Sequence, residues 1–297
     1  MQYDPLTSLA SIRSELEDVW KKLDDVYATF EPSRWSKKFG KTWVYADQPY
    51  HIAYFDQLLI PYISKGPNVP KDEQILYRTV RELNDWNARQ FARRPAQQTV
   101  EQSIGQMRTA RDTVRQLIAK MSEKNLDGRA WMPLFGGWAT VREHLHAILL
   151  HSIAEYVKLW IRTGQRGPSV SPSGMHLRLD FMMNFISSTL NREAAANKRF
   201  TMVWNFTGPG GGAWTFRVLD GSCTVTEELA TECNLMITLK PETLQKIAAK
   251  MEPPPLLILK GEMKIKGFLA MGTFAKLFPE PKPDQVIQTG SKGAALG

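Results

Sequence analysis

The feature that most constrains the fold is a change in hydrophobic periodicity a little past the middle of the chain. Up to residue 165 the apolar residues recur every three to four positions, as on one face of a helix. Residues 166–174 lack periodicity and are rich in glycine, proline and serine, which is typical of a linker. After one further helix, apolar residues alternate with polar ones, as in strands. The two patterns predict two domains of different class, each long enough to bury its own core.

The first domain, residues 1–165, is predicted to be an up-down bundle of four main helices. Its first helix carries an apolar seam with alternating three- and four-residue steps: Leu9, Ile12, Leu16, Val19, Leu23, Val26 and Phe30. Asp47 is expected to cap a second helix, with Pro49 in its first turn. A further helical stretch is expected over 73–94. The sequences Thr99–Gln102 and Thr140–Glu143 are capping boxes that start two more helices.

The helix predicted over Thr140–Trp160 carries three of the five histidines. His144, His151 and Glu155 fall at i, i+7 and i+11 on it, so they form one stripe. His51, near the start of the second helix, points the same way as the apolar residues around it. Imidazoles and a carboxylate facing a bundle interior indicate a metal or acid/base site. The alternative is a set of buried histidines that are only hydrogen-bonded.

Charge and composition exclude several classes of function. The net charge of +8 is spread evenly, because residues 1–165 and 166–297 each carry +4, and no nucleic-acid-binding motif accompanies it. We therefore expect no nucleic-acid partner. No apolar run is long enough to span a membrane and no signal peptide is visible, so a cytoplasmic location is expected. Cys223 and Cys233 are predicted to be free thiols.

The second domain is predicted over residues 175–281, followed by a flexible tail over 282–297. A helix at 175–190 precedes strands at 199–208, 213–222, 223–227 and 234–240; a helix at 241–251, a strand at 256–267 and a helix at 268–278 complete it. The glycine cluster Pro209–Gly212 is followed by a strand rather than a helix. It therefore lacks the helix N-terminus that a phosphate site needs and is interpreted as a hairpin loop.

Residues 1–165 resemble the DinB/YfiT-like four-helix bundles, a family that includes mycothiol-dependent maleylpyruvate isomerase. The resemblance rests on Gly40–His51, with the pattern G-x-x-W-x-x-x-D-x-x-x-H, and on a late helix ending in WIRTG. It implies a divalent metal, zinc, nickel or iron, held by His51 together with His151 and Glu155, with His144 as a substitute for Glu155. The family pairs are His with His, or Glu four residues before His, whereas Ala147 stands four residues before His151.

Residues 175–280 are similar to the sterol carrier protein 2 (SCP2-like) domain. The residues that carry the similarity include Gly261–Gly267, with the pattern G-x-M-K-I-K-G, and the closing helix rich in methionine and phenylalanine. The resemblance implies a five-stranded sheet with helices on one face and a tunnel for an apolar small molecule or lipid. The residues it assigns to the tunnel are Leu244, Met251, Phe268, Leu269, Met271, Phe274, Leu277 and Phe278.

Two functional hypotheses follow. In the first, a metal in the bundle activates a low-molecular-weight thiol or water, so that the protein is a metal-dependent thiol transferase, isomerase or hydrolase, and the SCP2-like domain helps to bind an apolar substrate. In the second, the protein is a non-catalytic carrier of a lipid or apolar ligand, and the bundle is structural or makes a homodimer. No serine-nucleophile, P-loop, C-x-x-C or H-E-x-x-H motif supports another enzyme class.

Overall fold

The computed structural model describes residues 3–39, 43–134, 137–164, 169–249 and 251–286. Within these ranges the chain forms two compact units, which we call the bundle unit and the sheet unit. The bundle unit comprises residues 6–169 and 283–286, and the sheet unit comprises residues 3–5 and 170–282. No helix in the described ranges is both long and apolar enough to cross a membrane.

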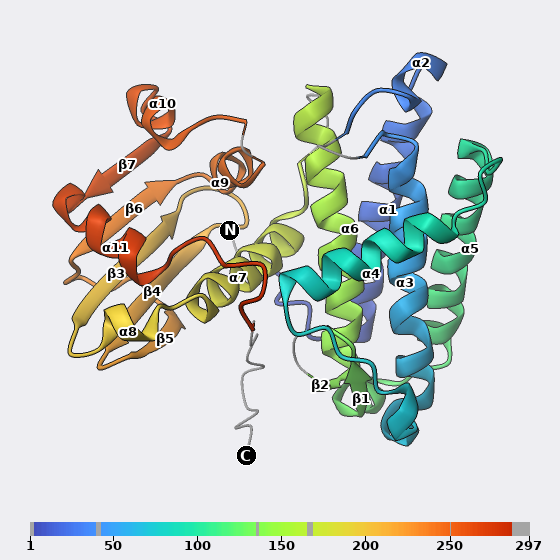
Figure 1. The fold of residues 1–297 in the computed structure, drawn as a ribbon, viewed down its shortest axis with the longest axis horizontal. Helices are drawn as coiled ribbons and strands as arrows, with labels where there is room; N and C mark the ends of the chain where they lie inside the picture. The colour runs from blue at the N-terminus through green and yellow to red at the C-terminus, as the bar shows by residue number, and fades with distance from the viewer. Residues whose placement is uncertain (1–2, 40–42, 135–136, 165–168, 250, 287–297) are drawn as a thin grey trace. The chain divides into compact units, whose positions relative to one another are not determined.

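The bundle unit is built on four long helices, as the sequence predicts (Figure 1). They are α1 (Leu9–Ala28), α3 (Asp47–Lys65), α5 (Val100–Ala119) and α6 (Val141–Thr163). The shorter elements are α2 (Pro32–Trp35), α4 (Val80–Arg93), η1 (Gly66–Asn68), η2 (Lys71–Glu73) and η3 (Glu123–Asp127). The predicted seam of α1 is buried from Ile12 to Val26, so apolar burial holds α1 in the bundle.

Of the predicted helix N-caps, the two threonine capping boxes form in the structure and the aspartate cap does not. Thr99 and Thr140 each accept a hydrogen bond from the backbone three residues later, and both capping boxes are complete. The prediction that Asp47 caps α3 is wrong. Asp47 is the first residue of the helix, and its carboxylate accepts from the N–H of Val44 and pairs with Arg94. The carboxylate is therefore committed to the preceding loop rather than to the first turn.

A short hairpin precedes α6, where the sequence indicates only a tight connection. It consists of β1 (Arg129–Met132) and β2 (Gly137–Thr140), with Trp131 opposite Trp138. Four-residue strands are too short to show a period-2 pattern, so periodicity does not detect them. The glycine-containing connections expected at Gly40 and at residues 135–136 lie outside the described residues.

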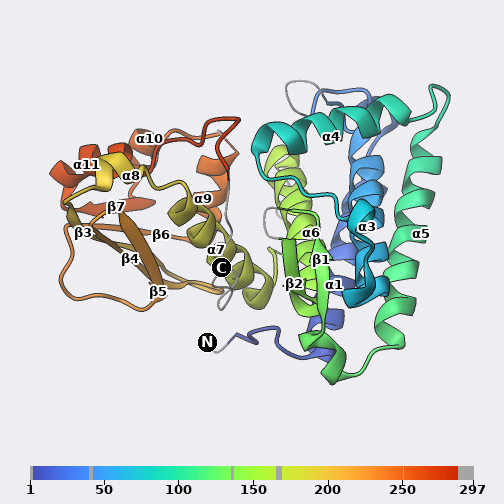
Figure 2. The ribbon, with the colours of Figure 1, turned by 60° about the horizontal axis from the view of Figure 1, so that its bottom comes forward.

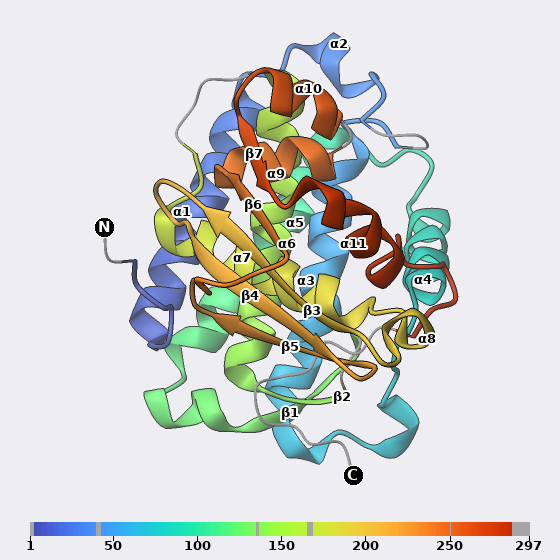
Figure 3. The same ribbon diagram turned by 90° about the vertical axis from the view of Figure 1, so that its left-hand side faces the viewer.

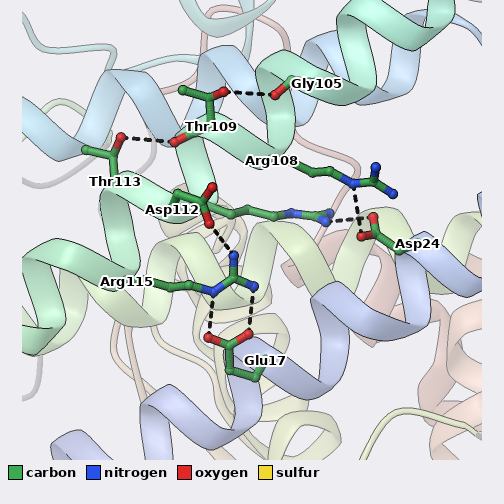
Figure 4. Close-up of polar contacts among 9 residues, drawn as sticks. Glu17, Asp24, Gly105, Arg108, Thr109, Asp112, Thr113 and Arg115 are labelled. Atoms are coloured by element: carbon green, nitrogen blue, oxygen red, sulfur yellow. Dashed lines mark hydrogen bonds and ion pairs between the residues drawn. The ribbon is translucent and has the colours of Figure 1, made fainter.

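Ion pairs join α1 to α5 along the bundle surface (Figure 4). Arg115 donates through Nε and Nη2 to the two carboxylate oxygens of Glu17, both at 2.7 Å. Asp24 accepts from Arg108 at 3.3 Å and from Arg111 at 2.9 Å. An exposed pair such as Arg115–Glu17 contributes little to stability.

Arg111 extends from this surface network into the core. Its side chain is 1% exposed, and its positive charge lowers the pKa of Asp56, a fully buried residue of α3. Neither carboxylate oxygen of Asp56 has a hydrogen-bond partner in the described part of the chain. Burial raises the pKa of Asp56 to about 7, and Arg111 only partly offsets that rise. Asp56 is thus an ionisable group held where its charge is costly.

The sheet unit contains one five-stranded sheet in the order β5-β4-β3-β6-β7, seen side by side in Figure 3. Its strands are β3 (Arg199–Phe206), β4 (Gly212–Leu219), β5 (Ser222–Glu227), β6 (Leu235–Leu239) and β7 (Met263–Lys266). Neighbours pair antiparallel except β3 and β6, which are parallel. Helices α7 (Pro172–Ser188), α8 (Arg192–Ala195), α9 (Pro241–Ala248), α10 (Pro254–Leu259) and α11 (Met271–Leu277) lie on one side of the sheet (Figure 2). The predicted fold class is confirmed.

Local assignments in the sheet unit differ from the prediction at three places. Helix α7 begins at Pro172, so it takes up part of the predicted linker. The predicted strand over 256–267 is wrong in its first half, because Pro254 at the first position starts the short helix α10 and Gly261, at a φ of 72°, ends it before β7. The predicted closing helix is a 3₁₀ turn, η4 (Phe268–Ala270), followed by α11.

Each unit includes a short segment from the far end of the chain. In the sheet unit, the ring of Tyr3 stacks on His176 at 3.6 Å and its hydroxyl donates to Glu227 at 2.9 Å. In the bundle unit, the backbone N–H of Arg81 donates to the carbonyl of Pro283, and its guanidinium pairs with Asp284 at 2.7 Å. The predicted flexible tail over 282–297 is therefore paired with α4 over its first residues; residues 287–297 lie outside the described ranges.

Candidate metal centre

Three side chains from two helices of the bundle unit converge at one point. His51 comes from the second turn of α3, and His151 and Glu155 come from adjacent turns of α6. One nitrogen or oxygen atom from each lies within 4.8 Å of the other two. The two Nε2 atoms are 3.0 Å apart, and His51 Nε2 lies 3.9 Å from Glu155 Oε1. The structure thus brings together the three residues that the sequence singles out.

The aromatic residues around the two imidazoles fix their orientation. The His151 ring stacks on Phe55 at 3.7 Å with an interplanar angle of 13°. Trp43 packs edge-on against His51 at 4.6 Å, and the ring of Phe91 lies nearly parallel to that of His51 at 6.3 Å. Because α3 contributes His51 and Phe55 one turn apart, its packing against α6 sets both rings at once.

A hydrogen-bond relay defines the protonation of His51. The Tyr54 hydroxyl donates its proton to Asn87 Oδ1 at 3.0 Å, so it accepts from His51 Nδ1 at 2.5 Å. The proton on Nδ1 leaves Nε2 of His51 with its lone pair directed at His151 and Glu155. A second hydrogen bond of this kind is what orients a histidine that ligates a metal.

Glu155 is held by two side chains other than the histidines, Gln48 and Lys158. The Gln48 amide donates to Glu155 Oε2 at 3.1 Å and to the Glu155 carbonyl at 3.1 Å, and Tyr27 in turn donates to Gln48. The Lys158 ammonium donates to Glu155 Oε1 at 2.5 Å. The carboxylate is 1% exposed, so these contacts compensate for its loss of hydration.

The site keeps its groups in the protonation states that bind cations. Burial lowers the pKa of His51 to about 4 and lowers the pKa of His151 well below its usual range, with the neighbouring His51 adding to the effect. Burial alone raises the pKa of Glu155, but Lys158 and the two imidazoles outweigh it and hold that pKa below its usual range. At neutral pH the trio is two neutral imidazoles and one carboxylate, the forms a divalent metal requires.

The donor set also fits a metal by its spacing. Donors bound tetrahedrally to zinc at about 2.0 Å lie roughly 3.3 Å from one another, and the separations of 3.0 and 3.9 Å here bracket that value. His151 Nδ1, the ring nitrogen that does not face His51, is buried and has no hydrogen-bond partner in the described part of the chain. Two nitrogens and one oxygen suit zinc, nickel or non-haem iron.

His144, the expected substitute for Glu155, belongs to a different environment. It is fully buried, and its two ring nitrogens contact the carbonyls of Thr140 at 2.8 Å and Trp131 at 2.9 Å. Through these carbonyls His144 connects α6 to the β1–β2 hairpin. His144 lies on the same face of α6 as His151 and Glu155, but two helical turns before His151. The structure does not bring it to the site.

Sequence reasoning missed the residues that support the trio. Gln48 lies three positions before His51, and Lys158 lies three positions after Glu155, so helical spacing was the available signal for both. No local pattern marks Tyr27 or Asn87, because their contacts depend on how α1 and α4 pack.

The residues that the resemblance assigns to a tunnel separate into two groups. Leu244, Leu277 and Phe278 are buried, and Phe274 packs edge-on against Trp204 while Phe278 packs against Phe216. Met251, Phe268 and Leu269 are exposed, with Leu269 at 98%, and Met271 is half-buried. The structure therefore brings only part of the set to the interior of the sheet unit.

Two further groups in the sheet unit bear on its chemistry. The indole nitrogen of Trp204, in the aromatic cluster beneath α11, is buried with no hydrogen-bond partner in the described ranges. The two cysteines form no disulfide, and burial raises the pKa of the Cys223 thiol to about 12, which argues against a nucleophilic thiolate there.

Comparison with known proteins assigns each unit separately. Residues 8–154 match the DinB superfamily, and residues 172–287 match the family described as alkyl sulfatase C-terminal. A histidine-to-alanine variant of the mycothiol-dependent maleylpyruvate isomerase superposes with a TM-score of 0.50 at 8% identity, covering 87% of this chain and 92% of that one. That likeness shows the fold alone. No curated protein matches this chain.

Two other solved structures align with smaller parts of the chain. The stereoselective inverting sec-alkylsulfatase from a Pseudomonas species is 18% identical with a TM-score of 0.30, and the match covers 49% of this chain and 26% of the sulfatase. The chain thus spans about a quarter of the length of the alkyl sulfatases that it matches. Sterol carrier protein 2 from Yarrowia lipolytica is 18% identical with a TM-score of 0.27, covering 33% of this chain and 91% of that protein.

Proposed function

Because the chain joins a DinB-superfamily bundle to an SCP2-like domain, we propose that the bundle binds a divalent metal and uses it to activate a low-molecular-weight thiol or a water molecule. The observation that carries the proposal is the convergence of His51, His151 and Glu155 within 4.8 Å. The related isomerase is named for its dependence on mycothiol, so a thiol is the first co-substrate class to test. The reaction class is a transferase, isomerase or hydrolase.

The chain's own residues have defined parts in this proposal. His51 offers the lone pair of Nε2 because its Nδ1–H donates a hydrogen bond to the Tyr54 hydroxyl, and Gln48 fixes the Glu155 carboxylate. When bound, the metal would supply a positive charge that lowers the pKa of a coordinated thiol or water. Three protein ligands leave a fourth position for that group. The free cysteines are consistent with a reducing compartment such as the cytoplasm.

The test is the metal content of the purified, untagged protein, measured by elemental analysis. We expect about one zinc, nickel or iron ion per chain, and loss of that ion in His51→Ala and in His151→Ala with the helical circular dichroism retained. His176→Gln, a change at a histidine of the sheet unit, is the matched control and should keep the metal. Wild-type protein that is metal-free and takes up none of these ions when they are added would contradict the proposal.

We propose carriage of an apolar ligand by the sheet unit as the second candidate function. The observation that favours it is the unpartnered Trp204 N–H within the aromatic cluster formed with Phe206 and Phe274. A ligand with an apolar body and one carbonyl or carboxylate would fill such a site and accept that hydrogen bond. In a purely non-catalytic carrier, the bundle would be structural or dimerising.

A fluorescent fatty-acyl probe tests this second function. Wild-type protein should bind the probe, and Trp204→Phe, which keeps an aromatic side chain but removes the N–H, should weaken binding about tenfold. Trp138→Phe, at the hairpin of the bundle unit, serves as the matched control and should bind as the wild type does. Failure of the wild-type protein to bind the probe would remove the carrier proposal while leaving the metal proposal intact.

A further inference from the structure

The contact between Lys158 and Glu155 occupies the carboxylate oxygen that a metal would need. Oε1 accepts from the Lys158 ammonium at 2.5 Å and is also the oxygen that faces His51 Nε2 at 3.9 Å. The other oxygen, Oε2, already accepts from the Gln48 amide. Glu155 Oε1 therefore contacts the Lys158 ammonium and also faces the point where His51, His151 and Glu155 converge.

From this geometry we propose that Lys158 is the resident cation of the site and that a metal binds by displacing it. In metal-free protein, the ammonium neutralises Glu155 and keeps the carboxylate directed at His51 and His151. When a divalent ion takes Oε1, the ammonium withdraws to water. Lys158 is thus a positioning residue that sets the metal affinity, and the inference rests on the metal site proposed above.

The two partners differ in how easily they can move. The Glu155 side chain is 1% exposed and is held by Gln48, whereas the Lys158 side chain is 45% exposed. A lysine has a flexible four-carbon stem, so its ammonium can leave the carboxylate and regain hydration without any change in the backbone. Lys158 is also only three residues from Glu155 on α6, so the same helix carries both partners.

Electrostatics favours the displacement. A divalent ion is the largest local charge in any site it enters, and an ammonium held about 4 Å from it is strongly repelled. A carboxylate as buried as Glu155 is in turn costly to leave without a positive partner. In this proposal Glu155 exchanges one cation for the other, Lys158 for the metal.

The experiment measures zinc affinity and stability in three proteins: wild type, Lys158→Met and Lys158→Arg. Methionine keeps an unbranched, flexible side chain of nearly the same length and removes its charge. The dissociation constant for zinc, from competition with a chromophoric chelator at pH 8, should fall at least about tenfold in Lys158→Met. The midpoint of thermal unfolding should fall in metal-free Lys158→Met and recover when zinc is saturating. Lys158→Arg should resemble the wild type in both measurements.

Lys21→Met is the matched control, because Lys21 pairs with Asp25 on α1 at 2.6 Å and both side chains are exposed. Its zinc affinity should not change. If Lys158→Met binds zinc no more tightly than the wild type, the displacement mechanism is wrong while the metal site stands. If neither protein binds zinc, the metal proposal itself fails and the inference fails with it.

Discussion

Removing the charge of Asp56 should stabilise the protein, and more so as the pH rises. Asp56 is fully buried, both its oxygens lack hydrogen-bond partners in the described ranges, and burial raises its pKa from 3.8 to about 7. As the pH rises through that interval, the carboxyl ionises in the unfolded chain before it ionises in the folded one. The wild type therefore loses stability as the pH rises through this range, whereas Asp56→Asn does not.

The magnitude follows from the pKa difference. One pKa unit corresponds to about 1.4 kcal/mol, so the ionisable carboxyl costs the wild type about 1.5 kcal/mol at pH 5 and about 4 kcal/mol at pH 8. Asparagine introduces an amide with its own unsatisfied atoms, and that cost is the same at both pH values. The gain of Asp56→Asn over the wild type should therefore grow by about 2.5 kcal/mol from pH 5 to pH 8.

Urea unfolding followed by circular dichroism of the helices measures this difference. The matched control is Asp85→Asn, a change of the same chemistry at an exposed position of α4, which should alter stability little at either pH. An Asp56→Asn gain that stays constant between pH 5 and pH 8 would refute the reasoning. So would a loss that grows with pH, which would mean that Arg111 holds Asp56 ionised in the folded protein.

Two further predictions concern the site and the bundle surface. Tyr54→Phe should weaken zinc binding about tenfold because His51 loses the acceptor for its Nδ1 proton, measured by the same chelator competition; an unchanged affinity would show that the hydroxyl does not orient His51. Arg115→Ala should lower the free energy of unfolding by at most about 1 kcal/mol, since Arg115 and Glu17 are both more than a third exposed. That loss should shrink in high salt, and a salt-independent loss in urea unfolding would instead implicate packing of the arginine on Trp20.

The sequence predicted the type and order of those helices and strands whose apolar pattern repeats over many residues. Twenty-residue helices such as α1 and α5 repeat the apolar pattern over several turns, and their buried faces match it. Pro254–Leu259 is apolar throughout and six residues long, so nothing in it distinguishes a strand from a helix except the prolines that start it. The hairpin β1–β2 is shorter still. The misassigned elements are therefore the short ones.

The sequence predicted those parts of the candidate site that depend on residue spacing within one helix. His151 and Glu155 share a face of α6 by spacing alone, and a family pattern supplied His51. What the spacing could not give is the rotation of α3 against α6, which decides that Gln48 reaches Glu155 and that His144 stays with the hairpin. Contacts between helices require the packed structure, because each depends on the rotation and height of two elements at once.

The short end segments described for the two units matter for anyone who dissects this chain. A gene fragment that stops after α6 encodes every long helix of the bundle unit but omits Pro283 and Asp284, the partners of Arg81. A fragment that starts at α7 encodes the whole sheet but omits Tyr3, which covers His176. A cut between α6 and α7 therefore separates neither fold cleanly. To keep these contacts, each expressed half must include a few codons from the opposite end of the reading frame.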